Sequence, residues 1–387
     1  KKTLSLLSLI ILCVCCNNTQ KPNAATEKND YYTIHFEGCL KNTSQFNLSE
    51  IADTIEYIKL KTPRSVIITS IRRVVYSEPY IFLTSKGIAY QFTKDGDFVR
   101  QIGREGKGPG EYLGVENIYV DNVKKEIILG AFLNVVYYNF NGEYLRSKKI
   151  MAQASAMIDS TIWIANPSHG YEKLKLFGVN QHFDTIACLK NNDIWESRNN
   201  DYWSVVSKAV NPFYHYNHKL YFKGYEDSDS IWEVDGSSIK LHAAIDMGKY
   251  KLQLENRPDY SYDNFNKNGG SYYRVPAVTE DNRFIFLLAG TWDGKLVTNI
   301  LFEKSSGKGF SLKQDSLSGI TDDILHGPPF WPLTITDKYY IGVIEADDLL
   351  NSVDTDSASP SLRKLISGID ENTNQLLILA KRTSLKI

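Results

Sequence analysis

The sequence predicts an all-β fold, a six-bladed β-propeller with four-stranded blades, for three reasons. A unit made of a strand, a polar turn and a more apolar strand occurs six times along the chain. The centres of the second strands are about 35 to 65 residues apart, which is near the length of a propeller blade. Several units continue into a hairpin that contains glycine, which completes four strands per blade.

Polar residues mark the turns of the six units. Asp, Asn, Ser and Pro favour tight turns, and an apolar run lies on each side of every turn. The hairpins that follow the units turn at Gly96, Gly142 and Gly236. The six predicted units span residues 71–83, 118–129, 154–165, 213–222, 278–288 and 333–344.

The second strands are apolar without clean alternation, as in 127–129 and 284–288. A blade is covered on both faces by its neighbours, so its central strands are expected to be buried on both sides. A sandwich of two sheets is the alternative fold. With 387 residues and 42% hydrophobic content, the chain is long enough for one large all-β domain or for two average domains.

Strands near the two ends of the chain predict how the ring closes. Residues 55–60 precede the first unit, and residues 374–381 follow the last one. Pairing these two strands within one blade satisfies edges that are otherwise exposed. Residues 33–36 predict an earlier strand, and Ser359–Pro360 predicts the start of a short capped helix.

A glycine-rich loop, GREGKGPGE, occupies residues 103–111. Its glycines allow the positive φ angles of a tight connection. The loop lacks the Gly-Lys-Ser/Thr ending of a phosphate-binding loop and does not open a helix, so we expect no nucleotide site there. We interpret the loop as a connection between blades, and Arg104 as a candidate for ligand contact in the central channel.

The first residues have the pattern of an export signal. Lys1 and Lys2 are followed by an apolar stretch over 4–14 that is too short to span a bilayer. The ending at Cys16, before a polar run, resembles the signal of a bacterial lipoprotein, in which the cysteine after the cleavage site is acylated. Cys15 stands where such signals usually have Gly, Ala or Ser. An ordinary secretory leader or an uncleaved anchor is the alternative.

This interpretation divides the chain into a signal peptide over 1–16, a flexible tether over 17–30 and a propeller domain over 31–387. The resemblance implies that a lipid on Cys16 anchors the protein in a membrane of the cell envelope. No acidic run follows Cys16, which favours the periplasm-facing side of the outer membrane. We expect the domain to be a monomer.

Charge and spacing argue against several kinds of site. With 44 basic and 45 acidic residues the net charge is −1, so no global field attracts nucleic acid. Cys39 and Cys188 are the only cysteines beyond the leader, and they form no Cys-x-x-Cys motif. Whether they pair is left open. His215 and His218 are expected on opposite faces, which does not suit a shared metal. We expect no metal and no cofactor.

Long polar segments at 191–203 and 250–273 carry several aromatic residues, as does the proline-rich segment 326–332. Rings in polar loops can stack on sugar faces while amides and carboxylates bond the hydroxyl groups. The alternative is that the rings pack these loops onto the propeller. The candidates for partner contact are Trp195, Trp203, Tyr260, Tyr262 and Trp331.

Several segments together resemble the secreted six-bladed propeller lipoproteins of Gram-negative gut bacteria. They are the leader, DTIEYIKL at 53–60, IGREGKGPGEY at 102–112, the six hairpins, and ENTNQLLILAK at 371–381. Residues 103–129 also resemble one NHL-type repeat, and the other blades depart from that spacing. The resemblance covers nearly the whole mature chain. It implies the fold and no particular activity.

Two functions remain open from the sequence. The favoured one is a non-enzymatic binding or scaffold module of the cell envelope that recognises a glycan, a peptide or a protein. The alternative is a hydrolase or lyase with its site at the mouth of the central channel. Two or more acidic or histidine side chains that converge there would favour the enzyme. An aromatic, Asn-rich surface would favour binding.

Overall fold

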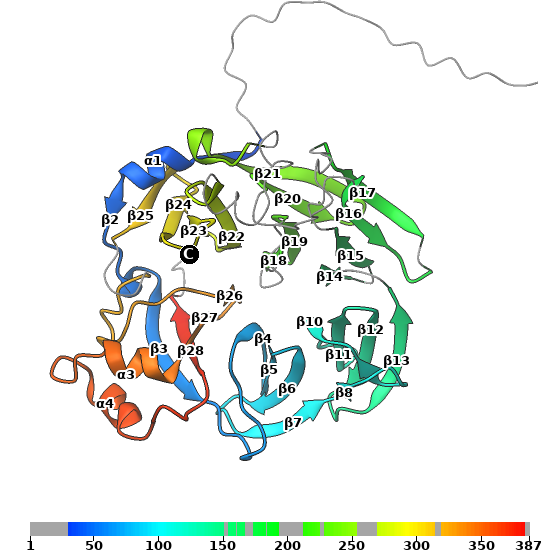
Figure 1. Cartoon of the computed structure of the whole chain (residues 1–387), viewed down its shortest axis with the longest axis horizontal. Coiled ribbons are helices and arrows are strands. Elements are labelled where there is room, and N and C mark those ends of the chain that lie inside the picture. Colours follow the sequence, from blue (N-terminus) through cyan, green and yellow to red (C-terminus); the bar gives the residue numbers. More distant parts are fainter. Residues whose placement is uncertain are drawn as a thin grey trace, which may run out of the picture. The chain divides into compact units, whose positions relative to one another are not determined.

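The computed structural model describes residues 30–150, 154–159, 161–166, 173–182, 184–192, 212–224, 228–253, 269–313 and 319–383. Residues Tyr31–Ile387 form one compact unit. In this unit six sheets are arranged around a central axis (Figure 1). The six-bladed propeller predicted from the sequence is therefore confirmed.

Each blade has four antiparallel strands, and its first strand lies nearest the axis (Figure 1). From the axis outward, blades 1 to 3 contain β4 (Ile71–Ser77), β5 (Tyr80–Ser85), β6 (Ile88–Thr93) and β7 (Phe98–Ile102); β10 (Val115–Asp121), β11 (Glu126–Ala131), β12 (Asn134–Asn139) and β13 (Tyr144–Lys149); and β14 (Ala154–Ile158), β15 (Thr161–Ala165), β16 (Leu174–Val179) and β17 (Thr185–Lys190).

Blades 4 to 6 complete the ring, and the six predicted hairpins are all present as the first two strands of a blade. From the axis outward, these blades contain β18 (Phe213–Tyr216), β19 (Lys219–Phe222), β20 (Ser230–Asp235) and β21 (Ser238–Asp246); β22 (Tyr273–Glu280), β23 (Phe284–Thr291), β24 (Val297–Glu303) and β25 (Lys308–Leu312); and β26 (Thr334–Ile335), β27 (Tyr339–Ile344), β28 (Leu376–Arg382) and β3 (Ala52–Lys59).

Apolar contacts between adjacent blades form the core. The described residues contain six buried hydrophobic clusters, and each cluster joins two neighbouring blades. The second strands are buried on both faces, as the apolar run of β23 predicts. The outermost strand β13, by contrast, is almost entirely exposed. Burial on both faces therefore explains why the inner strands do not alternate.

Blade 6 closes the ring with strands from both ends of the domain. β28 pairs antiparallel with β27 on one side and with β3 on the other. The residue pair Tyr57 and Ile378 illustrates the register. The predicted closure by N- and C-terminal strands is confirmed.

The segment before β3 covers the outer edges of two blades. β1 (Tyr32–His35) pairs parallel with β21, and β2 (Thr43–Ser44) pairs parallel with β25. The short helix α1 (Phe36–Lys41) lies between them, and the 3-10 turn η1 (Leu48–Glu50) leads on to β3. The sequence predicted the first strand but not this arrangement, which leaves fewer unpaired edge groups on blades 4 and 5.

Two helices, α3 (Ala346–Ser352) and α4 (Pro360–Ile366), connect β27 to β28. The predicted cap of α4 is confirmed, because Oγ of Ser359 accepts a hydrogen bond from the backbone N–H of Leu362 at 3.2 Å. A further short 3-10 turn, η2 (Gly248–Tyr250), follows β21. No helix in the described part of the chain is long and apolar enough to cross a membrane.

The glycine-rich loop connects the outermost strand of blade 1 to the innermost strand of blade 2, as predicted. Within it, β8 (Arg104–Glu105) and β9 (Glu111–Tyr112) form a small parallel pair.

The two cysteines of the domain are both free, with Cys39 buried and Cys188 exposed. They do not form a disulfide.

Substituting Gly96 by alanine is expected to destabilise the junction between blades 1 and 6. Gly96 has a φ of +84°, and an added Cβ would lie 2.3 Å from the carbonyl oxygen of Lys59. Gly236 also has a positive φ of +57°, with nothing within 4 Å of its added Cβ. We therefore expect Gly96→Ala to cost about 1–3 kcal/mol more than Gly236→Ala in denaturant unfolding. Equal costs would contradict the close packing at Gly96.

Candidate functional site

The innermost strands of blades 1, 2, 4, 5 and 6 enclose a cavity of about 630 Å³ in the central channel. Its volume lies within the range of small-molecule binding sites. The described residues that line it are Ser70, Ile71, Arg72, Arg73, Val74, Val75, Asn117, Ile118, Tyr119, Phe213, Tyr214, His215, Arg274, Pro276, Ala277, Val278, Thr279, Leu288, Leu333 and Thr334.

β-Bulges lie at the same end of three innermost strands. The register shifts between Ile71 and Arg73 in β4 and between Val115 and Asn117 in β10. A third shift lies between Arg274 and Ala277 in β22. A bulge inserts an extra residue into one strand and re-aims the side chains around it. Polar side chains that would otherwise alternate between the strand's two faces thereby reach the cavity wall.

Three arginines line the cavity. Arg72 and Arg73 come from β4, and Arg274 comes from β22. None of the described residues that line the cavity is acidic. Guanidinium groups bind carboxylate, sulfate and phosphate through paired, charge-assisted hydrogen bonds. The wall is therefore suited to an anion.

Arg73 is held by carbonyl groups. Its Nε donates to Oδ1 of Asn117 at 2.8 Å, and its Nη1 donates to the backbone carbonyl of Arg72 at 2.8 Å. Burial lowers the pKa of Arg73 to about 10, while Tyr119 and Glu116 act in the opposite direction. The guanidinium thus remains charged at neutral pH. A buried charge without a bonded counter-ion is costly, and an anionic group in the cavity would reduce that cost.

Asn117 adds a second polar group to the same part of the wall. The residue is 1% exposed, and its Nδ2 has no hydrogen-bond partner among the described residues. Buried amide donors are paired in the great majority of cases. A donor of this kind beside Arg73 suits a ligand oxygen.

His215 contributes a neutral ring to the channel. Its Nε2 lies 3.1 Å from the backbone carbonyl of Met157, so we assign the proton to Nε2 and leave Nδ1 as an acceptor. The side chain is open to the cavity, although protein surrounds it, and this enclosure lowers its pKa. His215 therefore adds no positive charge to the described wall at neutral pH.

A second, smaller cavity of about 250 Å³ adjoins the first. The two share lining residues, among them Thr279 and Leu333. The indole of Trp331 lines the smaller cavity and contacts the ring of Phe286 edge to face, with centroids 5.7 Å apart. The remaining lining residues are Ala277, Val278, Leu288, Pro332 and Val343.

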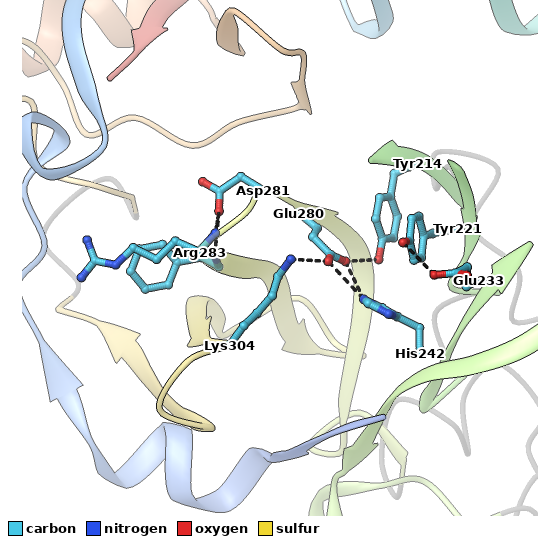
Figure 2. A network of polar contacts seen from close by, with 9 residues as sticks. Tyr214, Tyr221, Glu233, His242, Glu280, Asp281, Arg283 and Lys304 are labelled. Carbon is cyan, nitrogen blue, oxygen red and sulfur yellow. Dashed lines mark hydrogen bonds and ion pairs between the residues drawn. The ribbon is translucent and has the colours of Figure 1, made fainter. Parts of the chain in front are cut away.

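A buried polar network joins blades 4 and 5 (Figure 2). The Glu280 side chain, at the end of β22, is 0% exposed. Its carboxylate accepts hydrogen bonds from the Tyr214 hydroxyl at 2.8 Å and from Nζ of Lys304 at 2.5 Å, and Nε2 of His242 lies 2.9 Å away. Because Tyr214 also lines the channel, the network fixes one residue of the channel wall.

Aromatic rings enclose this network and separate it from solvent. Nζ of Lys304 lies 4.0 Å from the centre of the Tyr216 ring, and the rings of Tyr214 and Tyr221 stack at 5.1 Å. Burial, together with the nearby Glu280 carboxylate, raises the pKa of Tyr214. All charged atoms here have partners within the protein, so we interpret the network as structural.

The next residue, Asp281, connects blade 5 to blade 6. Its Oδ2 accepts a hydrogen bond from the hydroxyl of Tyr340 at 2.5 Å. Its Oδ1 accepts from the backbone N–H groups of Arg283 and Phe284 at 2.7 and 2.6 Å. Two consecutive residues of blade 5, Glu280 and Asp281, therefore form hydrogen bonds to blade 4 and to blade 6.

No group of three or more His, Cys, Asp or Glu side chains among the described residues could hold a metal ion.

Residues 31–381 match the sequence profile of the family described as "Domain of unknown function (DUF4934)". The chain belongs to the DUF4934 family. A comparison with curated proteins finds no match to this DUF4934 chain.

Two solved structures from Bacteroides resemble the DUF4934 domain. One is a protein of Bacteroides fragilis NCTC 9343 whose name describes it as a putative exported protein. It is 18% identical in sequence, with a TM-score of 0.64, and the match covers 92% of this chain and 99% of that chain. The other is a member of the DUF4221 family from Bacteroides vulgatus ATCC 8482, with 12% identity and a TM-score of 0.49, covering 85% and 96%. At 18% identity the first likeness shows the fold alone.

The DUF4934 structure brings one predicted contact residue to the cavities and places another elsewhere. Trp331 lines the smaller cavity. Arg104 lies on β8, its side chain is 79% exposed, and its Nε donates to Oε1 of Glu111 at 2.7 Å. Arg104 is not among the residues that line either cavity. The remaining predicted residues, Cys16, Trp195, Trp203, Tyr260 and Tyr262, lie outside the described residues.

The sequence analysis did not identify the three arginines of the DUF4934 channel. Arg72 and Arg73 stand at the start of the first hairpin, and Arg274 lies at the start of the first strand of blade 5. A signal was present, because Arg72 and Arg73 are two consecutive charged residues in the otherwise uncharged strand β4. The bulges that aim these residues depend on pairing with the next strand and leave no local pattern.

Proposed function

We propose that this protein is a ligand-binding propeller of the bacterial cell envelope that takes an organic anion into its central channel. The observation that carries the proposal is the cavity wall with Arg72, Arg73 and Arg274 and no acidic residue among its described members. The buried Nδ2 of Asn117 beside Arg73 supports it.

The proposal places the protein on a lipid anchor at Cys16, facing the periplasm. The lipoprotein-like ending of the leader, with its short apolar stretch and polar continuation, supports this location. A tether over 17–30 lets the propeller reach ligands near the membrane surface. The ligand is the anionic end of a glycan, a peptide or a smaller metabolite, since all three carry carboxylate, sulfate or phosphate groups.

Binding is favoured over hydrolysis by the groups in the channel. Glycoside hydrolysis uses two carboxyl groups on either side of the scissile bond. The described lining has one imidazole, His215, and no carboxylate. The buried carboxylate of Glu280 is fully hydrogen-bonded behind the wall and has no exposed surface.

Removing the channel arginines is expected to weaken anion binding. A hydrogen bond to a charged group contributes about 1.5–3 kcal/mol, so Arg72→Ala or Arg274→Ala should weaken binding by about 10- to 150-fold. Calorimetric titration with glucuronate, sulfate and phosphate measures the loss and distinguishes the three kinds of anion. Glucose is the neutral counterpart of glucuronate and should not bind.

Arg64→Ala is the matched control for loss of one positive charge. Arg64 is exposed and is not among the residues that line the cavity. This variant should bind each anion as the unmodified protein does, and melting temperatures should show that all three variants are folded. Equal losses in Arg64→Ala and Arg72→Ala, or no anion binding by the unmodified protein, would refute the proposal.

A further inference from the structure

We infer that the ligand of the channel carries an apolar ring several bonds from its anionic group. The ring occupies the cavity beside Trp331, and the anion lies against the arginines. This inference rests on the proposed function and narrows the ligand to a ring-bearing organic anion. Three features of the two cavities carry it: the wall that they share, the chemistry of their linings, and the spacing along β22.

The two cavities are neighbours with a common wall. The residues that line both are Ala277, Val278, Thr279, Leu288 and Leu333. The inferred ligand therefore contacts these shared residues between its anionic group and its ring. At about 250 Å³, the smaller cavity is below the range of sites that hold a whole drug-sized ligand, and it suits one ring-sized group.

The wall of the smaller cavity is apolar and aromatic. Among its described lining residues, only Thr279 and the indole N–H of Trp331 offer polar atoms. A sugar ring with several hydroxyl groups would lose hydrogen bonds to water that this wall cannot replace. A phenyl or similar ring can instead pack against Trp331 and the aliphatic side chains around it.

Leu333 lies where the two cavities meet, just before β26. The residue is 38% exposed and lines both cavities. An apolar ring in the smaller cavity would cover this surface. The exposure of Leu333 does not depend on the arginines at the other end of the site.

The spacing along β22 sets the length of the ligand. The register shift in β22 places Arg274 opposite Gly290 and Ala277 opposite Leu288, two residues apart on β23, and a strand rises by about 3.3 Å per residue. The backbone positions of Arg274 and Ala277 are therefore about 7 Å apart along the sheet. A ring joined directly to a carboxylate is too short to use both ends, whereas a ring on a flexible chain can do so.

The test is a titration of the full chain with phenylalkanoates, from phenylacetate to 6-phenylhexanoate, and with the alkanoates that lack the ring. We expect the ring to increase affinity by about 10-fold or more at the best chain length, the gain of burying a phenyl-sized apolar surface. Phenylacetate should show little gain. Arg72→Ala should weaken both series by the same factor.

Two variants that fill the smaller cavity separate this inference from the proposed function. Val343 lines the smaller cavity and not the larger one, so Val343→Phe and Val343→Trp should abolish the gain from the ring and leave alkanoate binding unchanged. Leu145→Trp is the control, because Leu145 is 43% exposed on the outer strand β13. Melting temperatures identify any variant that does not fold.

The outcomes distinguish the two proposals. Alkanoate binding that depends on Arg72, with less than a twofold gain from the ring, would overturn the inference and leave the proposed function intact. A ring gain that persists in both filled variants would also overturn it. Failure of every anion to bind would overturn both.

Discussion

Replacing Glu280 by leucine is expected to lower the free energy of unfolding by about 3–5 kcal/mol, the usual cost of removing one partner of a buried ion pair. The change leaves the ammonium of Lys304, whose side chain is 8% exposed, without its carboxylate. It also removes the acceptor for the hydroxyl of Tyr214. Denaturant unfolding followed by circular dichroism measures the loss.

A double variant separates loss of the charge partner from loss of packing. Glu280→Leu with Lys304→Met removes both charges, and it should recover much of the stability because no unpaired charge remains. Glu233→Leu is a milder control, since the Glu233 side chain is 20% exposed and its partner Lys219 is 37% exposed. A cost below about 1 kcal/mol for Glu280→Leu, near that of exposed ion pairs, would contradict the importance of this network.

The domain is expected to lose stability steeply as the pH rises above about 10, the ordinary pKa of tyrosine. Burial raises the pKa of Tyr112 to about 12. Burial likewise raises the pKa of Tyr57, Tyr119, Tyr138, Tyr214, Tyr221 and Tyr340. These hydroxyls stay protonated in the folded domain at a pH at which they ionise in the unfolded chain.

The direction in which stability changes with pH follows from the number of protons that the folded and unfolded states bind. Above pH 10 the unfolded chain binds fewer protons than the folded domain, so stability falls by about 1.4 kcal/mol per pH unit for each such tyrosine. Seven tyrosines together lose about 10 kcal/mol per unit, which is comparable to the whole stability of a typical domain. Arg73, whose pKa burial lowers to about 10, acts in the opposite sense but is a single group.

Tyrosinate absorbance and circular dichroism, recorded together, test this prediction. We expect most tyrosine absorbance to appear in the same step as the loss of β structure, between about pH 10 and 12. A domain that keeps its β structure while its tyrosines titrate near their ordinary pKa would contradict it.

The strands and turns of this propeller could be predicted because their signals are local. A turn such as Asn217–His218 is marked by its own residues, and both have positive φ in the structure. The cap at Ser359 is equally local. The helix α3 was missed, although Asp347 and Asp348 in its first turn have the acidic character that favours a helix start.

The site could not be predicted because its signals are non-local. Which face a strand residue presents depends on register, and a bulge changes that face at Arg72 without altering the local sequence pattern. Glu280 lies in the predicted unit 278–288, but its role depends on Tyr214 and Lys304 from other strands. The pairing of β1 with β21 and of β2 with β25 was not predicted for the same reason, because the partner strands lie about 200 residues or more along the chain.

The closure of blade 6 determines the order in which a growing chain can complete its fold. β3 is made before blade 1, but its pairing partner β28 follows roughly 300 residues later. During synthesis β3 therefore has an unpaired edge until five blades and the first strands of the sixth have been produced. Unpaired apolar strands of this kind associate with one another. A nascent chain that stops before β28 has six sets of inner strands and no closed ring, so completion depends on the last strand to be made.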